Sequence, residues 1–165
     1  MFEKIRKMKN QKGFTLVELI VVLVILAILA AMLVPALTGY IDKANKQKIV
    51  ATTRQVVMAA QTEISEAYSK ATLKNDKITI TNGAVASNPA DDKITGKSIV
   101  ELAEVGTIGE GTSATYSLKN GIKSIEITYD KSNGHVKTVV LTQGTKTCTY
   151  TEGKADGTDG AYNVP

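Results

Sequence analysis

The sequence predicts an α+β protein with a long N-terminal α-helix and a roughly four-stranded antiparallel sheet. Three observations predict it: an apolar run at Leu19–Val34, apolar residues at helical spacing down to about Ser69, and alternating β-branched residues after Ala114. A helix from Phe14 to Ser69 is about 55 residues and roughly 80 Å long, which is too long to be buried in a domain of this size. Its hydrophobic first half must therefore protrude, while its amphipathic second half packs on the sheet.

The apolar segment is long enough to span a membrane. Leu19–Val34 contains sixteen consecutive apolar residues, and about twenty residues of helix cross the hydrocarbon core of a bilayer. Met1–Gly13 holds five Lys or Arg residues and one Glu, whereas the rest of the chain has equal numbers of acidic and basic residues. The positive-inside rule keeps this basic end in the cytoplasm and places the C-terminus outside. Because the rest of the chain has no excess of positive charge, nucleic-acid binding lacks its main source of affinity, and no nucleic acid is expected as a partner.

One acid, Glu18, lies near the start of the apolar segment. An ionised carboxylate at the centre of a membrane helix costs roughly 2.5–3.5 kcal/mol on insertion scales. The segment is open to three interpretations: a secretory signal peptide, an ordinary single-pass anchor, or a helix that later enters a protein bundle. A signal peptide lacks its usual A-x-A exit here, since only Val34-Pro35-Ala36 follows, and an ordinary anchor has no use for the acid. The third interpretation makes the acid a docking group.

Gly13–Glu18, with the sequence GFTLVE, and the apolar run after it resemble the processing signal of type IV pilins and pseudopilins. The resemblance implies that a prepilin peptidase cuts after Gly13 on the cytoplasmic side and N-methylates the new first residue, Phe14. It also implies that Glu18 meets the amine of Phe14 from a neighbouring subunit, so that two groups that are costly alone form a compensated pair. Gly13 has no side chain, which lets an extended backbone enter a narrow protease site. Thr15 is assigned a minor docking role through its hydroxyl, and the short basic leader resembles the type IVa arrangement.

Pro35 and Gly39 follow the apolar run. Proline inside a helix removes one hydrogen bond, and glycine weakens the helix further. We expect a gentle kink in the isolated subunit, and the resemblance implies that the segment between these two residues melts when subunits pack in a filament. The chain should then have three parts: a leader at 1–13 that the peptidase removes, a transmembrane and filament-core helix at 14–39, and a globular region at 40–165.

The globular region divides into an amphipathic helix, a polar αβ-loop, an antiparallel sheet and a C-terminal loop, at 40–69, 70–113, 114–151 and 152–165. Apolar or small residues three or four apart form one stripe on the helix: Ile49, Thr53, Val56, Val57, Ala60, Ile64, Ala67 and Tyr68. The sheet should lay one face on this stripe, because isolated hairpins are not stable in water. This arrangement is the pilin fold that the resemblance implies.

Local signals place the shorter elements of the globular region. Ser98 and Glu101 have the spacing of a capping box, which predicts a short helix at Ile99–Val105. Asn120-Gly121 is a strong hairpin signal. Four strands are expected in one sheet, with the first two joined by that hairpin, at 114–119, 122–129, 135–142 and 146–151.

The sequence offers no set of residues for catalysis. Cys148 and His135 are each the only residue of their kind, so no disulfide can form within the chain and a zinc site lacks ligands. Cys148 is expected to be a half-buried apolar residue of a strand. Asp156 and Asp159 prompt a calcium hypothesis, but calcium takes about six to eight oxygen ligands and a turn-rich tail is expected instead. The Gly-containing segment Thr107–Ser113 is only a weak pattern for phosphate binding. From all these observations together we expect no enzyme activity, no cofactor and no metal.

The resemblance implies a structural role. We expect a prepilin, a major pilin, that leaves the cytoplasmic membrane to form a homopolymeric extracellular pilus for adhesion, twitching motility or biofilm. A membrane assembly platform and its ATPase would supply the energy for extraction. Many type IV pilins close a C-terminal loop with a disulfide, so the single Cys148 favours a lineage that does without one, such as a Gram-positive one. A pseudopilin of a type II secretion or competence system, and a secreted binding domain whose N-terminus is discarded, stay open as alternatives.

Replacing Gly13 by a bulky residue should leave uncut precursor in the membrane, because a side chain at the cut site keeps the backbone out of the protease. Intact-mass measurement of the membrane fraction distinguishes precursor from mature chain. Normal maturation of the variant would contradict the assigned cleavage site.

Overall fold

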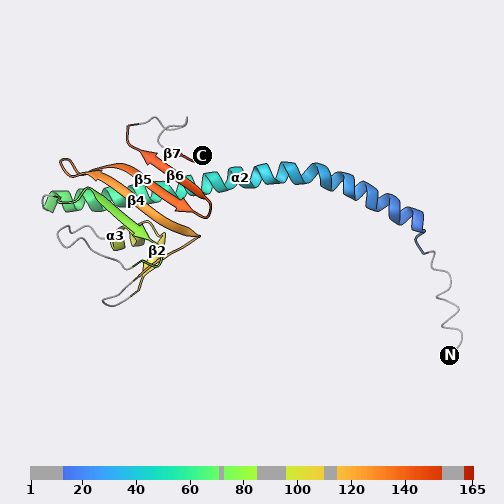
Figure 1. Ribbon diagram of the computed structural model, residues 1–165, viewed down its shortest axis with the longest axis horizontal. Helices are drawn as coiled ribbons and strands as arrows, with labels where there is room; N and C mark the ends of the chain where they lie inside the picture. The colour runs from blue at the N-terminus through green and yellow to red at the C-terminus, as the bar shows by residue number, and fades with distance from the viewer. Residues whose placement is uncertain (1–12, 71–72, 85–95, 110–114, 154–161) are drawn as a thin grey trace, which may run out of the picture. The chain divides into compact units, whose positions relative to one another are not determined.

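The computed structural model describes residues 13–70, 73–84, 96–109, 115–153 and 162–165 (Figure 1). The chain divides into two compact units, Met1–Lys43 and Ala44–Pro165, and we call the second unit the head. The first unit contains the apolar part of a long helix. The head contains the rest of that helix, a five-stranded sheet, a short helix and a second sheet of two strands.

The long helix, α2, runs from Leu16 to Lys70 and confirms the predicted helix within two residues at its start and one at its end. The helical assignment continues through Pro35 and Gly39. At Pro35, whose ring removes a backbone donor, the carbonyl oxygen accepts a hydrogen bond of 2.9 Å from the hydroxyl of Thr38. The predicted melting of this segment in a filament is a separate state of the chain and stays a prediction.

The described residues of the first unit, 13–43, are all exposed. An 18-residue window of α2 has a mean hydropathy of 3.2 and none of it is buried, so the helix is long and apolar enough to cross a membrane. A signal sequence near the N-terminus would meet the same criterion. The distinction between these possibilities therefore depends on the residues around the start of the helix.

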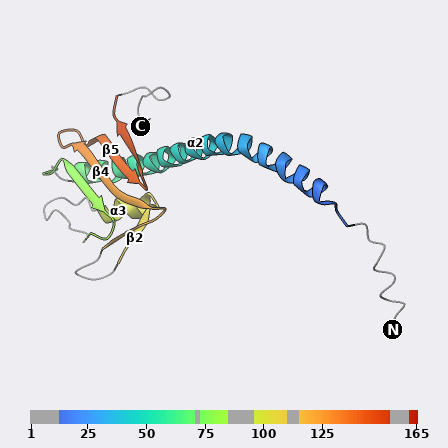
Figure 2. The same ribbon diagram turned by 45° about the vertical axis from the view of Figure 1, so that its right-hand side comes forward.

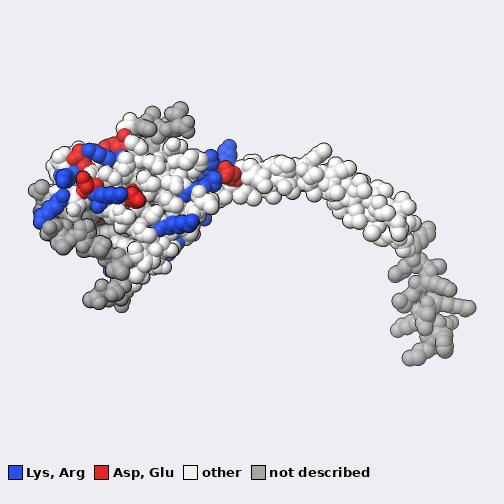
Figure 3. All heavy atoms as spheres, in the orientation of Figure 1, with Lys and Arg blue, Asp and Glu red and all other residues white. Residues whose placement is uncertain are grey.

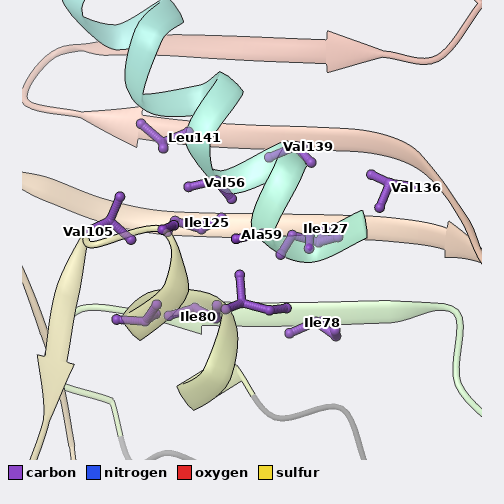
Figure 4. Packing of buried hydrophobic residues seen from close by; sticks show 14 of the residues in the cluster. Val56, Ala59, Ile78, Ile80, Val105, Ile125, Ile127, Val136, Val139 and Leu141 are labelled. Atoms are coloured by element: carbon purple, nitrogen blue, oxygen red, sulfur yellow. The ribbon is translucent and has the colours of Figure 1, made fainter. Parts of the chain in front are cut away.

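The second half of α2 lies against the sheet, as two views of the head show (Figures 1 and 2). Its buried residues are Ile49, Thr52, Thr53, Val56, Ala59, Ala60, Ile64 and Ala67. In Figure 4, Val56 and Ala59 of the helix lie among Ile125, Val139 and Leu141 of the sheet. The stripe predicted from the sequence is therefore the packed face, with the difference that Val57 is half-buried and Tyr68 is exposed.

The main sheet is antiparallel, in the order β1-β4-β5-β6-β7. Its strands are β1 (Lys77–Thr81), β4 (Ile122–Asp130), β5 (His135–Gln143), β6 (Lys146–Thr151) and β7 (Tyr162–Asn163). Ile125 of β4 lies opposite Ile80 on one side and Leu141 on the other, and all three are completely buried. Burial alternates along these strands as it must in a sheet with one covered face. The strands predicted at 122–129, 135–142 and 146–151 are thus confirmed.

The first predicted strand pairs differently from our expectation. Tyr116–Leu118 (β3) pairs with Gly106–Ile108 (β2) in a separate two-stranded sheet, so the predicted hairpin between 114–119 and 122–129 is wrong. The turn itself exists, because Asn120 and Gly121 both have positive φ, of 56° and 74°. The edge of β4 that β3 would have used is occupied by β1. A turn signal fixes the reversal of the chain, but not which strand takes the neighbouring place.

The αβ-loop contains more regular structure than the sequence suggested. The strands β1 and β2 both lie in the predicted irregular loop at 70–113. The short helix α3 runs from Gly96 to Leu102 instead of Ile99–Val105, so Ser98 lies inside the helix and is not its cap. The helix ends early because Glu104 adopts a positive φ of 56°, which does not continue a right-handed helix.

The C-terminal loop predicted at 152–165 also holds a strand. Tyr162 and Asn163 form β7 and pair with Tyr150 and Thr149 of β6. The rings of Tyr150 and Tyr162 lie 5.1 Å apart, and the guanidinium carbon of Arg54 lies 4.9 Å from the centre of the Tyr162 ring. An aromatic pair and a cation–π contact therefore hold the last strand, where the resemblance would have implied a disulfide.

Polar side chains fix α2 to the turn between β4 and β5. The Gln61 side-chain amide donates to the Gly134 carbonyl at 2.8 Å, and its oxygen accepts from the Val136 N–H at 2.9 Å. The Tyr68 hydroxyl donates to the Ser132 carbonyl at 2.8 Å. A Cβ added at Gly134, whose φ is 71°, would lie 3.0 Å from Tyr68, so the turn approaches the helix closely.

Gln61→Ala should lower the free energy of unfolding of the head by about 1–3 kcal/mol, because it leaves two backbone groups of the turn without their partner. Thermal unfolding of the detergent-solubilised chain measures the loss. Gln55→Ala, at an exposed position of the same helix, is the matched control and should change the midpoint little. Equal midpoints for the two variants would show that the Gln61 bonds add nothing to stability.

Asp130→Asn should remove a pH-dependent part of the head's stability. In the folded chain the Ser132 hydroxyl and N–H donate to the Asp130 carboxylate and Lys137 lies 3.1 Å from it, which lowers the pKa of Asp130 from 3.8 to about 2. Since the folded pKa is depressed, the stabilisation is complete above the unfolded pKa and is lost as the pH falls through about 2. Thermal midpoints of wild type and variant should differ at neutral pH and converge in acid. Lys137→Gln keeps the Ser132 bonds and should retain most of this pH dependence. A difference in thermal midpoint between wild type and Asp130→Asn that stays constant with pH would contradict the assignment.

Candidate functional site

The residues predicted to carry processing and docking lie together at the start of α2. Gly13, Phe14 and Thr15 precede the helix and have no regular secondary structure. A Cβ placed on Gly13 would meet no atom within 4 Å, and Phe14 is 90 % exposed. The predicted scissile bond between Gly13 and Phe14 is therefore in an accessible, non-helical stretch, which is the form of substrate that a protease site binds.

Thr15 and Glu18 form a capping box at the first turn of α2. The Thr15 N–H and hydroxyl donate to Glu18 Oε2 at 2.9 and 2.8 Å, and the Glu18 N–H donates to Thr15 Oγ1 at 3.2 Å. Thr15 is thus the N-cap and Glu18 the third residue of the helix, and each satisfies a backbone donor of the other. An N-cap residue typically contributes about 0.5–2 kcal/mol to helix stability.

This box gives Thr15 a capping role within its own chain, in addition to the minor docking role expected from the sequence. The pattern Thr15-Leu16-Val17-Glu18 has the required spacing, so the signal was present in the sequence. We applied that pattern to Ser98 and Glu101, where the helix in fact begins earlier, and not to this segment. The capping role was therefore missed: Thr15 is a positioning residue that orients the carboxylate of Glu18.

The capping box also answers how one chain carries an acid beside apolar residues. Both hydrogen bonds from Thr15 reach Oε2 of Glu18. Among the described residues Oε1 keeps its capacity to accept, and Glu18 itself lies in a shallow groove lined by Phe14, Val17, Leu19, Val21 and Val22. The carboxylate is thus partly satisfied by its own chain and still presents an oxygen to a donor from elsewhere.

Pro35 and Gly39, the predicted kink and melting positions, lie about five turns further along α2. Both are exposed, and a Cβ at Gly39 would meet no atom within 4 Å. Since the described residues 13–43 are all exposed, the helical form of this segment within the first unit is maintained by the hydrogen bonds of the helix itself. Whether it melts on assembly stays a prediction.

The residues considered for metal and thiol chemistry belong to the head, and some of them lie outside the described residues. Cys148 is completely buried in β6, and burial raises the pKa of its thiol while a hydrogen bond with Thr53 acts in the opposite direction. The prediction of a small apolar residue in a strand is confirmed, with full burial instead of half. Asp156 and Asp159 lie outside the described residues, within which no group of three or more His, Cys, Asp or Glu residues could hold a metal ion. Of the weak phosphate pattern at 107–113, the described part is Thr107 and Ile108, which belong to β2, and Gly109, which has no regular secondary structure.

Comparison with known protein families gives one match. The model of the prokaryotic N-terminal methylation motif matches residues 8–34, which include the predicted cut site, the capping box and the apolar run. Neither the comparison with curated proteins nor the comparison with solved structures gave a significant match. The chain thus carries the N-terminal signature of type IV pilin and pseudopilin precursors, and the long exposed apolar helix fits that signature.

Proposed function

We propose that the chain is a structural subunit of a type IV pilus. In this proposal it is cut after Gly13, N-methylated at Phe14, and polymerised into a surface filament through the apolar part of α2. The observation that carries the proposal is the exposure of that helix: its described residues 16–43 are all exposed although most are apolar. A surface of this kind is stable only in lipid or among similar helices, and a filament core consists of such helices.

Processing prepares the start of the helix for assembly. Cleavage removes a leader with five basic residues and one acid, and creates an amine on Phe14. That amine is a cation one helical turn before Glu18, so each mature chain carries one positive and one negative group at the same end. Two chains that are offset along their axes can then place the amine of one beside the carboxylate of the other.

The capping box supports different roles for the two carboxylate oxygens of Glu18. Thr15 occupies Oε2 from within the same chain, and the remaining oxygen suits the amine of a neighbour. An ion pair that is buried in an apolar bundle adds little net stability, because both charges lose their hydration. It does penalise every arrangement in which one charge is left without its partner. The pair therefore sets the offset between neighbouring chains, and packing of the helices supplies the stabilisation.

The energy balance implies further partners. A helix that moves from lipid to a protein bundle gains packing contacts, but little from the hydrophobic effect, because lipid tails are already apolar. Extraction from the membrane therefore needs an external source of work. In this class an assembly platform and its ATPase supply it, and a prepilin peptidase acts before them. Adhesion, twitching motility and biofilm formation are roles that a surface filament of this kind would serve.

A pseudopilin of a type II secretion or competence system is the alternative, since it shares the processing signal and the helix. The two differ in the product: a pilus gives long surface filaments with this chain as the main component. Electron microscopy of sheared filaments, with peptide identification, separates them. A mature chain that starts near Leu37 without methylation would instead indicate signal peptidase and a secreted domain.

Three variants test the docking role of Glu18. Glu18→Ala and Glu18→Gln should both be cut and methylated, as intact mass will show, but should yield about tenfold fewer filaments or less, because each removes one charge of a buried pair. Glu18→Gln is the matched control for helix capping, since glutamine also serves at this position of a capping box. Thr15→Ala removes the cap and keeps the charge, and should reduce filament yield far less.

Two results would contradict this assignment. Wild-type filament yield from Glu18→Gln would show that the charge has no part in docking. A loss in Thr15→Ala as large as that in Glu18→Ala would assign Glu18 to helix capping alone.

A further inference from the structure

Four lysines of the head lie on the segments that surround one polar pocket. Lys46 and Lys48 belong to α2, and Lys119 and Lys123 flank the turn that leads into β4. The pocket has a wall from each of three segments and is lined by Asn45, Lys48, Ile49, Asn120, Gly121, Gln143, Gly144, Thr145 and Lys146. The segments 44–49, 119–123 and 143–146 contain no acidic residue. We call the four lysines the basal patch.

The basal patch modifies the conclusion drawn from charge balance. Outside the leader the sequence has equal numbers of acids and bases, which suggested that no basic face exists. Figure 3 shows several blue side chains, with one red group beside them, at this end of the head, and blue and red side chains together at its other end. Asp42 and Lys146 each have a further interaction, so Lys146 is not counted in the basal patch.

Backbone and side-chain bonds hold the pocket in shape. The Gly144 N–H donates to the Gly121 carbonyl at 3.0 Å, and the Gln143 side-chain amide donates to the Asn120 carbonyl at 2.7 Å. These bonds tie the turn before β4 to the turn between β5 and β6. A Cβ on Gly121 or Gly144 would meet no atom within 4 Å, so both turns are open on their outer side. Lys48, the one lysine of the basal patch that lines the pocket, therefore lies beside two turns that are bonded to each other.

The position of the basal patch in the chain indicates its partner. Ala44 is the first residue of the head, and Lys46 and Lys48 follow Leu37 by nine and eleven residues. In a helix that is about 14–17 Å of rise. Lipid headgroups extend roughly 5–7 Å beyond the hydrocarbon, and the field of an anionic surface reaches about 8 Å further at physiological salt. This rise depends only on the number of residues between Leu37 and the two lysines.

We propose that the basal patch binds phosphodiester groups of anionic lipids in the outer leaflet while α2 is still in the membrane. Lysine ammonium groups bind phosphate oxygens as point charges, and amide groups such as those of Asn45 and Asn120 add hydrogen bonds. The lipid source is favoured over soluble anions because the apolar helix holds the head beside a bilayer. The proposal rests on the membrane-anchored stage of the proposed function and not on polymerisation.

Lysine acetylation of the full-length mature chain in nanodiscs tests the proposal. Acetylation rates are measured by mass spectrometry in discs of phosphatidylcholine alone and of equal parts phosphatidylcholine and phosphatidylglycerol. Lysines of the basal patch should react about fivefold more slowly in the anionic discs, as expected for a lysine at such a surface. High salt should remove the difference. Lys77 and Lys137, which lie near the opposite end of the sheet strands, are internal controls and should react equally in both discs.

A pair of double variants sharpens the test. Lys48→Gln with Lys123→Gln should abolish the lipid-dependent protection of Lys46 and Lys119, whereas Lys77→Gln with Lys137→Gln should retain it. Both double variants keep Gly13, Phe14 and Glu18, so processing and filament yield are scored separately and a failure of the filament proposal remains distinguishable.

Three outcomes would overturn the proposal. Equal rates for the basal patch in the two kinds of disc would exclude anionic lipid as its partner. Equal protection by inorganic phosphate added to phosphatidylcholine discs would assign the patch to a soluble anion. Protection by duplex DNA in those discs, without protection by phosphatidylglycerol, would make it a nucleic-acid site.

Discussion

The packing of one face of α2 against the main sheet is the contact on which the rest of the head depends. Val56, Ala60 and Ile64 have no exposed surface, and the strands opposite them supply equally buried residues such as Ile125 and Leu141. A five-stranded sheet with one apolar face is not stable in water until that face is covered. One helix face covers it, and α3 with the small sheet extends the same core. One face of the second half of α2 is buried in this way, whereas the described residues of its first half, 16–43, are all exposed.

The exposed first half of α2 explains the hydrogen bonds at the start of that helix. An apolar helix without a protein partner is stable in a bilayer, and its polar end groups must then be satisfied locally. The reciprocal bonds between Thr15 and Glu18 do this without a second chain. They also leave the carboxylate able to accept another donor. A single side chain can therefore serve the lone subunit and the assembled form in turn, which suits a protein that exists in both.

The sequence predicted the elements that repeat a simple pattern over many residues. The helix and its buried stripe follow from apolar residues three or four positions apart, and the strands β4, β5 and β6 follow from alternating apolar and polar residues. The ends of these elements were therefore predicted within a residue or two. The pairing of β3 was wrong because the place beside β4 belongs to Ile78 and Ile80 of β1, more than forty residues earlier in the chain than their partners. Neither a turn signal nor a local alternation contains that information. The basal patch was missed for the same reason, since its lysines come from two segments that are about seventy residues apart in the sequence.

The candidate site at the start of α2 could be proposed from the sequence alone, because its residues lie within six positions of each other. Gly13, Phe14 and Glu18 were recognisable from their order alone, and the family model matches the same stretch. The role of Thr15 was readable too, but the capping pattern was assigned to Ser98 instead. Short motifs of this kind are reliable only where a long helical period follows them, as it does after Thr15 and does not after Ser98.

The way the last strand is held has a consequence for how the protein can mature. Arg54, Tyr150 and Tyr162 fasten β7 by ring contacts, and the only thiol, that of Cys148, is sealed inside the core. The head thus reaches its final form without oxidative folding enzymes. A reducing agent has no disulfide within the chain to break, so these contacts would hold under reducing conditions as well.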